Sequence, residues 1–180
     1  MKRHSLYAWT PLALLALHAA LIVGCGYHLS GTGAGAGVIP SYVTTIAVLP
    51  FENRTERPEI EQRVTEAVTR ELTRRSKYKI LTDPSRADTV LEGAVTSYRT
   101  PPVEFTASGR QSRVEATVMV QATLRDTAQD EVLWSQTGLI FREQFDVPDS
   151  GKFFDQESVA LDQIAQGAAE VLVTSMLEGF

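Results

Sequence analysis

The chain has 180 residues and a formal net charge of −5, from 17 lysines and arginines against 22 aspartates and glutamates. An acidic chain without a basic run argues against a nucleic acid as its main partner. All three histidines and the single cysteine lie before residue 29, so the rest of the chain lacks the residues that Ser-His-Asp triads, Cys-His pairs and histidine zinc sites need. Carboxylate chemistry remains open, but the acidic residues are spread over helix faces and loops. We therefore expect no enzyme activity, no cofactor and no metal.

The first residues have the parts of a secretory signal. Lys2 and Arg3 provide a basic start, and residues 11–23 are almost entirely apolar. A transmembrane anchor is the alternative, but this run is shorter than the roughly 20 residues that a spanning helix needs. The sequence Ile-Val-Gly-Cys that ends at Cys25 resembles the lipobox cut by the lipoprotein signal peptidase. We predict a signal peptide over residues 1–24 and a lipid on Cys25.

Cleavage there leaves a mature chain of 180 − 24 = 156 residues with a charge of 15 − 22 = −7, enough for one domain. Acyl chains on Cys25 give membrane anchoring without a spanning helix. By analogy with enteric sorting rules, Gly26 after the cysteine favours the outer membrane. We therefore expect a lipid-anchored protein of the outer membrane, facing the periplasm.

The glycine-rich sequence GYHLSGTGAGAG follows the cysteine. Its alternating glycines suggest a dinucleotide-binding loop, but such a loop needs a strand before it and a helix after it. A flexible tether is the better interpretation. The predicted organisation is thus a lipidated tether over residues 25–39 and a single domain over residues 40–180.

The domain opens with a predicted strand over residues 44–51 and a helix that runs from Pro58 to Arg75. The helix has an apolar stripe at helical spacing, made of Ile60, Val64, Ala67, Val68 and Leu72. Its other face carries acid–base pairs four residues apart, namely Glu59–Arg63, Glu66–Arg70 and Glu71–Arg75. We interpret that face as a solvated helix surface.

The next elements are strands. A short strand is expected over residues 78–81, and a longer one over residues 87–98 with Gly93 as a bulge. Residues 99–113 are polar and form a long loop or hairpin tip. Residues 114–124 alternate strictly between apolar and polar side chains, which predicts a strand with one buried face. A turn, a strand over residues 131–142 and a loop over residues 144–152 complete this part.

The last predicted element is a helix over residues 155–177. Its inner stripe consists of Leu161, Ile164, Ala168, Val171, Leu172 and Ser175. The order β-α-(β)-β-β-β-α predicts an α+β fold, with two helices packed on one face of a mostly antiparallel or mixed sheet of about four strands. The other face would be solvated or bound by a partner.

Several of these pieces resemble one known family. The start Cys-Gly-Tyr-His-Leu at residues 25–29, the strand over residues 114–124 with its partner strand, and Phe-Asp-Val-Pro at residues 145–148 before the last helix are similar to the lipopolysaccharide-assembly lipoprotein family LptE. The resemblance covers nearly all of the mature chain. It implies a protein that plugs the outer-membrane β-barrel LptD, helps that barrel to fold, and contacts lipopolysaccharide on its way to the outer leaflet.

The resemblance also implies where lipopolysaccharide would bind. In the family, basic residues before the long central strand and in the loop before the last helix are implicated. The nearest positions in this sequence are Arg110, Arg113 and Lys152. Arginine forks and lysine point charges are the side chains that hold phosphates. Solvated loop charges are the alternative interpretation of these three residues.

A second resemblance leaves a different function open. The sequence IAVLPFENRT at residues 46–55 is also similar to the opening of the curli-secretion lipoproteins, the TolB N-terminal domain and the outer-membrane activators of peptidoglycan synthases. The alternative is thus a periplasmic adaptor that binds a protein partner and has no glycolipid role.

Overall fold

The structure is a computed structural model that describes residues 38–147 and 152–179. The predicted signal peptide, the lipidation site Cys25 and nearly all of the predicted tether lie outside the described residues. The elements are, in order, β1 (Thr45–Val48), β2 (Glu52–Asn53), α2 (Ile60–Arg75), β3 (Lys79–Leu81), the 3-10 helix η2 (Pro84–Arg86), β4 (Thr89–Arg99), β5 (Pro102–Phe105), β6 (Gln111–Asp126), β7 (Val132–Asp146) and α3 (Phe153–Glu178).

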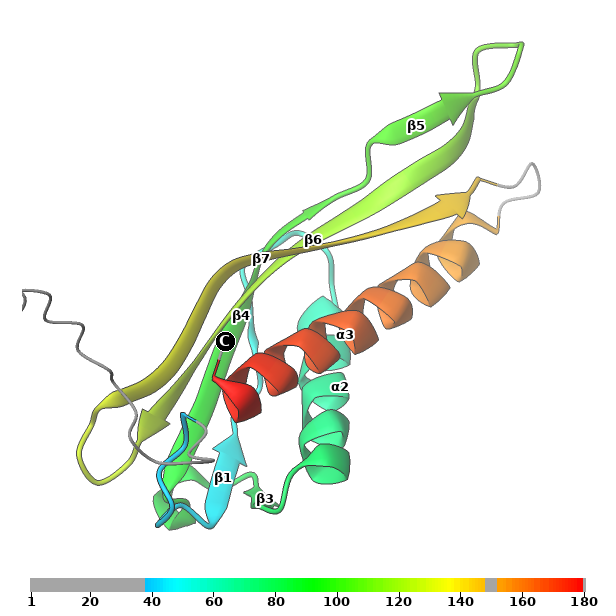
Figure 1. Ribbon diagram of the computed structural model, residues 1–180. Coiled ribbons are helices and arrows are strands. Elements are labelled where there is room, and N and C mark those ends of the chain that lie inside the picture. The colour runs from blue at the N-terminus through cyan, green and yellow to red at the C-terminus, as the bar shows by residue number, and fades with distance from the viewer. Residues whose placement is uncertain (1–37, 148–151, 180) are drawn as a thin grey trace, which may run out of the picture. The chain divides into compact units, whose positions relative to one another are not determined.

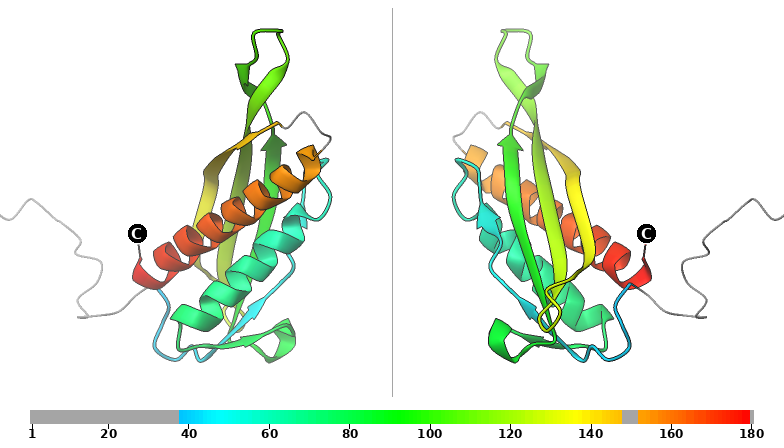
Figure 2. Two further views of the ribbon diagram at one scale, coloured as in Figure 1. Left: turned by 90° about the vertical axis from the view of Figure 1, so that its right-hand side faces the viewer. Right: turned by 90° about the vertical axis from the view of Figure 1, so that its left-hand side faces the viewer.

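The strands form one seven-stranded mixed sheet, and both helices cover the same face of it (Figure 1, Figure 2). The order is β3-β1-β4-β6-β5, with β2 also paired to β4 and β7 to β6. β1 pairs in parallel with β3 and β4, whereas the long β4–β6 and β6–β7 pairs are antiparallel. The predicted α+β class is confirmed. The predicted number of about four strands is wrong, because β2 and β5 have only two and four residues, all exposed, and are too short for a sequence pattern to identify them.

The central strand β6 is held by its alternating side chains. It contains the predicted strand over residues 114–124 and extends it to 16 residues. The side chains on one face are completely or almost completely buried, and they are Val114, Ala116, Val118, Val120, Ala122 and Leu124. Fully burying a valine or leucine stabilises a fold by about 1.5–3 kcal/mol, so this row fixes which face of the sheet meets the helices.

The helix α2 begins at Ile60, two residues after the predicted start at Pro58. Glu59 precedes the helix with a φ of 65°. This left-handed conformation cannot be part of a right-handed helix, so the helix begins only at the next residue. The predicted apolar stripe of α2 is buried along its whole length.

The helix α3 covers the predicted range 155–177 and adds residues at both ends. Five residues of its predicted inner stripe are buried, namely Leu161, Ile164, Ala168, Leu172 and Ser175. The prediction that Val171 is buried is wrong, because its side chain is 44% exposed. It lies one residue before Leu172 and therefore about 100° away around the helix.

The charged face of α2 is only partly solvated. The surface pair Glu66–Arg70 is present at 3.7 Å, as predicted. Arg63, which we expected to pair with Glu59, reaches across to Asp162 and Ser158 of α3. This side of α2 therefore contributes to helix–helix contact.

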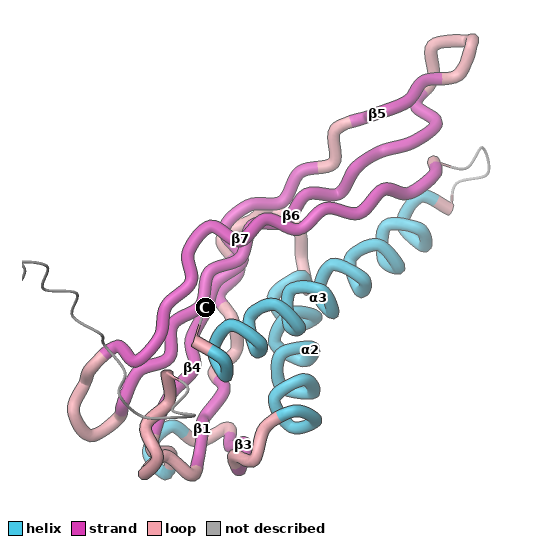
Figure 3. The backbone as a smooth tube through the Cα atoms, viewed as in Figure 1, coloured by secondary structure: helices cyan, strands magenta, loops and turns pink. Residues whose placement is uncertain are grey.

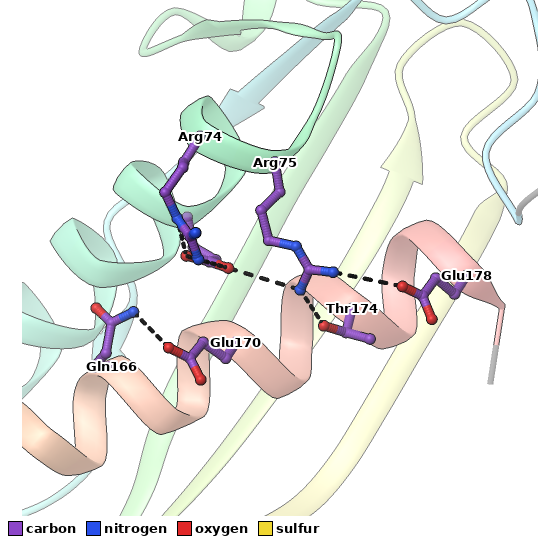
Figure 4. Close-up of polar contacts among 7 residues, drawn as sticks. Arg74, Arg75, Gln166, Glu170, Thr174 and Glu178 are labelled. Carbon is purple, nitrogen blue, oxygen red and sulfur yellow. Dashed lines mark hydrogen bonds and ion pairs between the residues drawn. The ribbon is translucent and has the colours of Figure 1, made fainter.

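Glu71 lies on the face of α2 that we predicted to be solvated, but it is buried, with 2% exposure. Its carboxylate binds Arg74 at 2.7 Å and lies 3.7 Å from Arg75. Arg75 continues to Thr174 and Glu178 of α3 (Figure 4). The predicted Glu71–Arg75 pair thus exists within α2, and the further contacts of Arg75 join the C-terminal turns of the two helices.

Gly93 is not the predicted bulge of β4. The irregularity in the β4–β6 register lies between Val95 and Ser97. Gly93 is instead covered by the ring of Phe51, because a Cβ built on it would lie 2.3 Å from Cε1 of that ring and 2.7 Å from the carbonyl oxygen of Gln121. The glycine permits this close approach.

Two segments that we predicted as loops are partly strands. β5 pairs with the start of β6 inside the predicted loop over residues 99–113, and β7 continues to Asp146, beyond its predicted end at residue 142. No helix in the described part of the chain is long and apolar enough to cross a membrane.

Candidate binding site at the end of the long strands

Arg110 lies in the turn of a β-hairpin that extends past the ends of the helices (Figure 1). The N–H of Thr106 donates to the carbonyl oxygen of Arg110 at 2.8 Å, and the N–H of Gly109 donates to the carbonyl oxygen of Thr106 at 2.9 Å. Gly109 has a φ of 80°, in the region that favours glycine. The same hairpin carries Phe105, which is 59% exposed. It therefore presents a cation and an aromatic ring to solvent.

Arg113 lies at the start of β6, and two carboxylates hold it. Its Nε donates to Oδ1 of Asp146 on β7 at 2.9 Å, and its Nη1 donates to Oε1 of Glu104 on β5 at 2.9 Å. The hydrogen bond that Arg113 donates to Asp146 and the negative charge of Glu104 raise the pKa of Arg113 above its ordinary value. Arg113 therefore fastens the hairpin to β7 as well as placing a cation there.

Lys152 is exposed and stands directly before α3. The ring of the next residue, Phe153, packs against Phe145 of β7 with 5.4 Å between the ring centroids. Phe145 is paired in register with Val114 of β6, the neighbour of Arg113. The structure thus brings Arg110, Arg113 and Lys152 to one end of the sheet, although they come from three segments.

A hollow of about 420 Å³ opens at this end between β7 and α3. Arg113 and Asp146 line it from the strands, and Gln156, Val159 and Gln163 line it from α3. Val159 is one of the exposed large apolar residues of the described structure. Glu143 also lines it, so the hollow is mainly polar, with one cation, two carboxylates and a few apolar side chains.

A buried polar cluster lies near the start of α3, and the sequence interpretation did not predict it. Glu157 is 4% exposed, and its Oε1 accepts a hydrogen bond from the hydroxyl of Tyr98 on β4. Its Oε2 lies 3.0 Å from Nη2 of Arg57 in the β2–α2 loop. Burial and the bond to Glu157 raise the pKa of Tyr98 above its ordinary value. The cluster joins β4, α3 and the loop.

The ion pair in this cluster is imperfect. Oε2 of Glu157 and Nε of Arg57 are both buried, and neither has a hydrogen-bond partner among the described residues. The 3.0 Å approach is therefore a charge contact without hydrogen-bond geometry. One feature of the sequence could have indicated that Glu157 is buried. It lies four residues before Leu161 and seven before Ile164, and so falls on the inner stripe of α3.

The charges of the site determine what it can bind. Ion pairs on a protein surface contribute about 0–1 kcal/mol each. The contacts of Arg113 with Asp146 and Glu104 are therefore weak enough to open, but both carboxylates stay beside Arg113 and repel an incoming anion. Any contact with an anion would also weaken with salt. Within the described residues, no group of three or more His, Cys, Asp or Glu side chains is placed to hold a metal ion.

One solved structure of low sequence identity shares the fold with a TM-score above 0.5, and two others fall just below that value. A putative lipoprotein from Caulobacter crescentus CB15 is 15% identical with a TM-score of 0.54, over 71% of this chain and 88% of that one. The rare lipoprotein B from Shewanella oneidensis is 14% identical with a TM-score of 0.49, over 72% and 92% of the two chains. PelC from Paraburkholderia phytofirmans is 22% identical with a TM-score of 0.49, over 78% and 94%.

No curated protein sequence is detectably similar to this chain. The family model for lipopolysaccharide assembly, LptE, matches residues 43–176. That match spans the chain from just before β1 to the last turns of α3. The chain therefore belongs to the LptE family of lipopolysaccharide-assembly lipoproteins.

Proposed function

We propose that this protein is an outer-membrane lipoprotein that plugs the β-barrel LptD and helps it to assemble, and so takes part in moving lipopolysaccharide to the outer leaflet. The observation that carries the proposal is the family match over residues 43–176. The proposed role is structural, with no catalytic step. A lipid on Cys25 would hold the chain at the inner leaflet, and the glycine-rich segment after it would give the domain reach.

The open face of the sheet supports this role. Its side chains on β6 are mainly polar and partly exposed, and they include Thr117, Gln121 and Thr123. The lumen of a large outer-membrane barrel is polar and holds water. A domain with one helix-covered face and one polar sheet face can occupy such a lumen without exposing its core.

We further propose that the end of the sheet with Arg110, Arg113 and Lys152 contacts the anionic groups of lipopolysaccharide. The three cations lie near exposed apolar residues, and an amphipathic glycolipid offers phosphates and acyl chains together. Exposed Phe105 and Val159 supply the apolar surface. The neighbouring carboxylates limit the affinity, so contact during passage fits this site better than tight storage.

The test replaces Arg110, Arg113 and Lys152 together by glutamine. We expect this triple variant to bind purified lipopolysaccharide about tenfold more weakly, equivalent to about 1.4 kcal/mol, and to recover the barrel as well as wild type does. The matched control neutralises Arg70, Lys79 and Arg125, which changes the net charge equally on other parts of the domain. Equal lipopolysaccharide binding by both triple variants would remove the proposed site.

A further inference from the structure

The strand β7 has a long open edge. It has 15 residues and pairs with β6 along one side. No other described strand pairs with its second side, and Figure 3 shows it running along the margin of the sheet. The outermost strands β3 and β5, by contrast, have only three and four residues.

The register identifies the backbone groups on this edge. The N–H of Val147 donates to the carbonyl oxygen of Ser112 at 2.9 Å, and the pairing then runs without a shift from Arg113↔Asp146 to Val120↔Leu139. In an antiparallel pair, alternate residues turn their N–H and C=O groups toward the partner strand. The other residues of β7 turn their N–H and C=O groups outward, away from β6. These outward residues are Ile140, Arg142, Gln144 and Asp146.

Natural sheets protect long edges with proline, lysine, bulges or a covering element. β7 contains no proline and no lysine. Its register with β6 shifts twice, once between Trp134 and Val132 and once close to Gly138, which has a φ of 71°. Residues 139–146 therefore form an edge without a register shift, and its charged side chains are Arg142, Glu143 and Asp146.

We propose that the edge of β7 over residues 139–146 binds an extended segment of the partner protein, which adds to the sheet as a further strand. This inference rests on the proposed function only for the identity of the partner, the barrel. Main-chain hydrogen bonds would supply the affinity in this mode of recognition, and alternate side chains the specificity. Ile140 is 43% exposed and Arg142 is exposed on the same face, so the segment would carry an apolar residue opposite the first and an acidic one opposite the second.

A second copy of this chain fits the edge less well. Two copies of residues 139–146 can pair antiparallel in two registers of greatest overlap. One register sets Arg142 against Arg142, and the other sets Asp146 against Ile140. Like charges directly opposite one another destabilise a strand pair, and the net charge of −5 on each chain adds repulsion.

Hydrogen exchange of the backbone amides tests the proposal. The full chain is measured in outer-membrane preparations and, after separation from the barrel, as purified protein in detergent. We expect the outward amides of Ile140, Arg142 and Gln144 to exchange about a hundredfold more slowly in the membrane. The inward amides of Phe141 and Glu143 serve as an internal control, since β6 protects them in both samples.

Equal exchange of the outward amides in both samples would overturn the proposal, and so would protection in the purified protein that rises with its concentration, which would indicate a second copy. Recovery of the barrel from the same membranes is scored separately. Protection without recovery of the barrel would support the edge and contradict the proposed function.

A pair of variants sharpens the test. Gln144→Pro removes one outward N–H, and proline is tolerated on an edge strand where the N–H faces solvent. Gln144→Ala keeps that N–H, and both variants lose the same side-chain hydrogen bond to Glu115. We expect Gln144→Pro to abolish the protection in the membrane and Gln144→Ala to retain it. Protection of a folded Gln144→Pro chain at the wild-type level would overturn the proposal, and should that variant not fold, the wild-type exchange alone decides.

Discussion

Glu157 places a negative charge where β4, α3 and the β2–α2 loop meet. Its side chain is almost fully buried, and its partners are the hydroxyl of Tyr98 and the guanidinium of Arg57. Removing one member of a buried ion pair leaves the other charge without compensation, which costs about 3–5 kcal/mol. Arg57 keeps 25% of its side chain exposed, and this exposure together with the incomplete hydrogen bonding puts the expected cost at the lower end of that range.

We therefore predict that Glu157→Ala lowers the free energy of unfolding by about 3 kcal/mol. Urea unfolding followed by the fluorescence of Trp134, a buried residue near the C-terminal end of α3, measures the change. Glu170→Ala is the matched control, because Glu170 is exposed on the same helix, and it should change stability by less than about 0.5 kcal/mol. Equal effects of the two variants would show that the buried cluster contributes nothing to stability.

Asp88 is a second residue whose charge the fold requires. Its Oδ2 accepts hydrogen bonds from the backbone N–H of Thr44 at 2.8 Å, from the Thr44 hydroxyl at 2.8 Å and from the N–H of Thr45 at 2.9 Å. These bonds, led by the one from the Thr44 backbone, lower the pKa of Asp88 from 3.8 to about 2. A depressed pKa in the folded state gives stability that is present above the unfolded pKa and is lost as the pH falls through the folded one.

We predict that the free energy of unfolding falls between about pH 4 and pH 2, and that Asp88→Asn makes this fall shallower. Urea unfolding at several pH values measures the slope. Asp155→Asn removes one carboxylate from the exposed start of α3 and controls for the change in net charge. An Asp88→Asn curve that runs parallel to the wild-type curve would contradict the assignment.

At the scale of the elements, two glycines have opposite roles. Gly93 lies under the ring of Phe51, and an added Cβ would come within 2.3 Å of that ring. Gly167 lies inside α3, and a Cβ built on it meets no atom within 4 Å. Forcing a methyl group into a packed site costs about 1–3 kcal/mol, whereas replacing glycine by alanine in a helix stabilises it by about 0.5–1 kcal/mol.

The pair Gly93→Ala and Gly167→Ala therefore applies the same chemical change with opposite predicted signs. We expect the midpoint of thermal unfolding to fall for Gly93→Ala and to rise for Gly167→Ala, as measured by circular dichroism. A neutral Gly93→Ala variant would mean that Phe51 moves aside without cost.

The elements that could be predicted from the sequence are those whose periodic pattern continues over many residues. α2, α3 and β6 each carry a stripe or an alternation that local physics alone explains. β2, β5 and the last residues of β7 have no such pattern, and they become strands because β4 or β6 lies beside them. Gly93 was identified as a special position, but the reason, the ring of Phe51, is a tertiary contact.

The candidate site was predictable only in part. Arg110, Arg113 and Lys152 came from a family resemblance, and the sequence alone could not show that β7 and Phe153 bring them to one end of the sheet. The carboxylates of Glu104 and Asp146 that hold Arg113 lie 9 and 33 positions away in sequence. Their pairing follows from the register of three strands, which no local pattern encodes.

At the scale of the whole molecule, the described domain has one sheet face covered by helices and one polar face left open. The open edge of β7 and the cationic end of the sheet belong to the same part of the molecule, since Asp146 contributes to both. A domain that meets a barrel wall and a passing glycolipid needs both kinds of surface. We therefore propose that the protein-binding edge and the ligand-binding end are adjacent regions of one sheet.

Identifying the protein that purifies with this chain from the cell envelope is the most direct test of the proposed function. The lipidated chain, tagged at its C-terminus, is purified from envelopes solubilised in mild detergent, and the proteins that come with it are identified and quantified. We expect to recover one large outer-membrane β-barrel, LptD, at about one copy per copy of the chain. Recovery of a peptidoglycan synthase or a secretion ring, with no barrel, would contradict it.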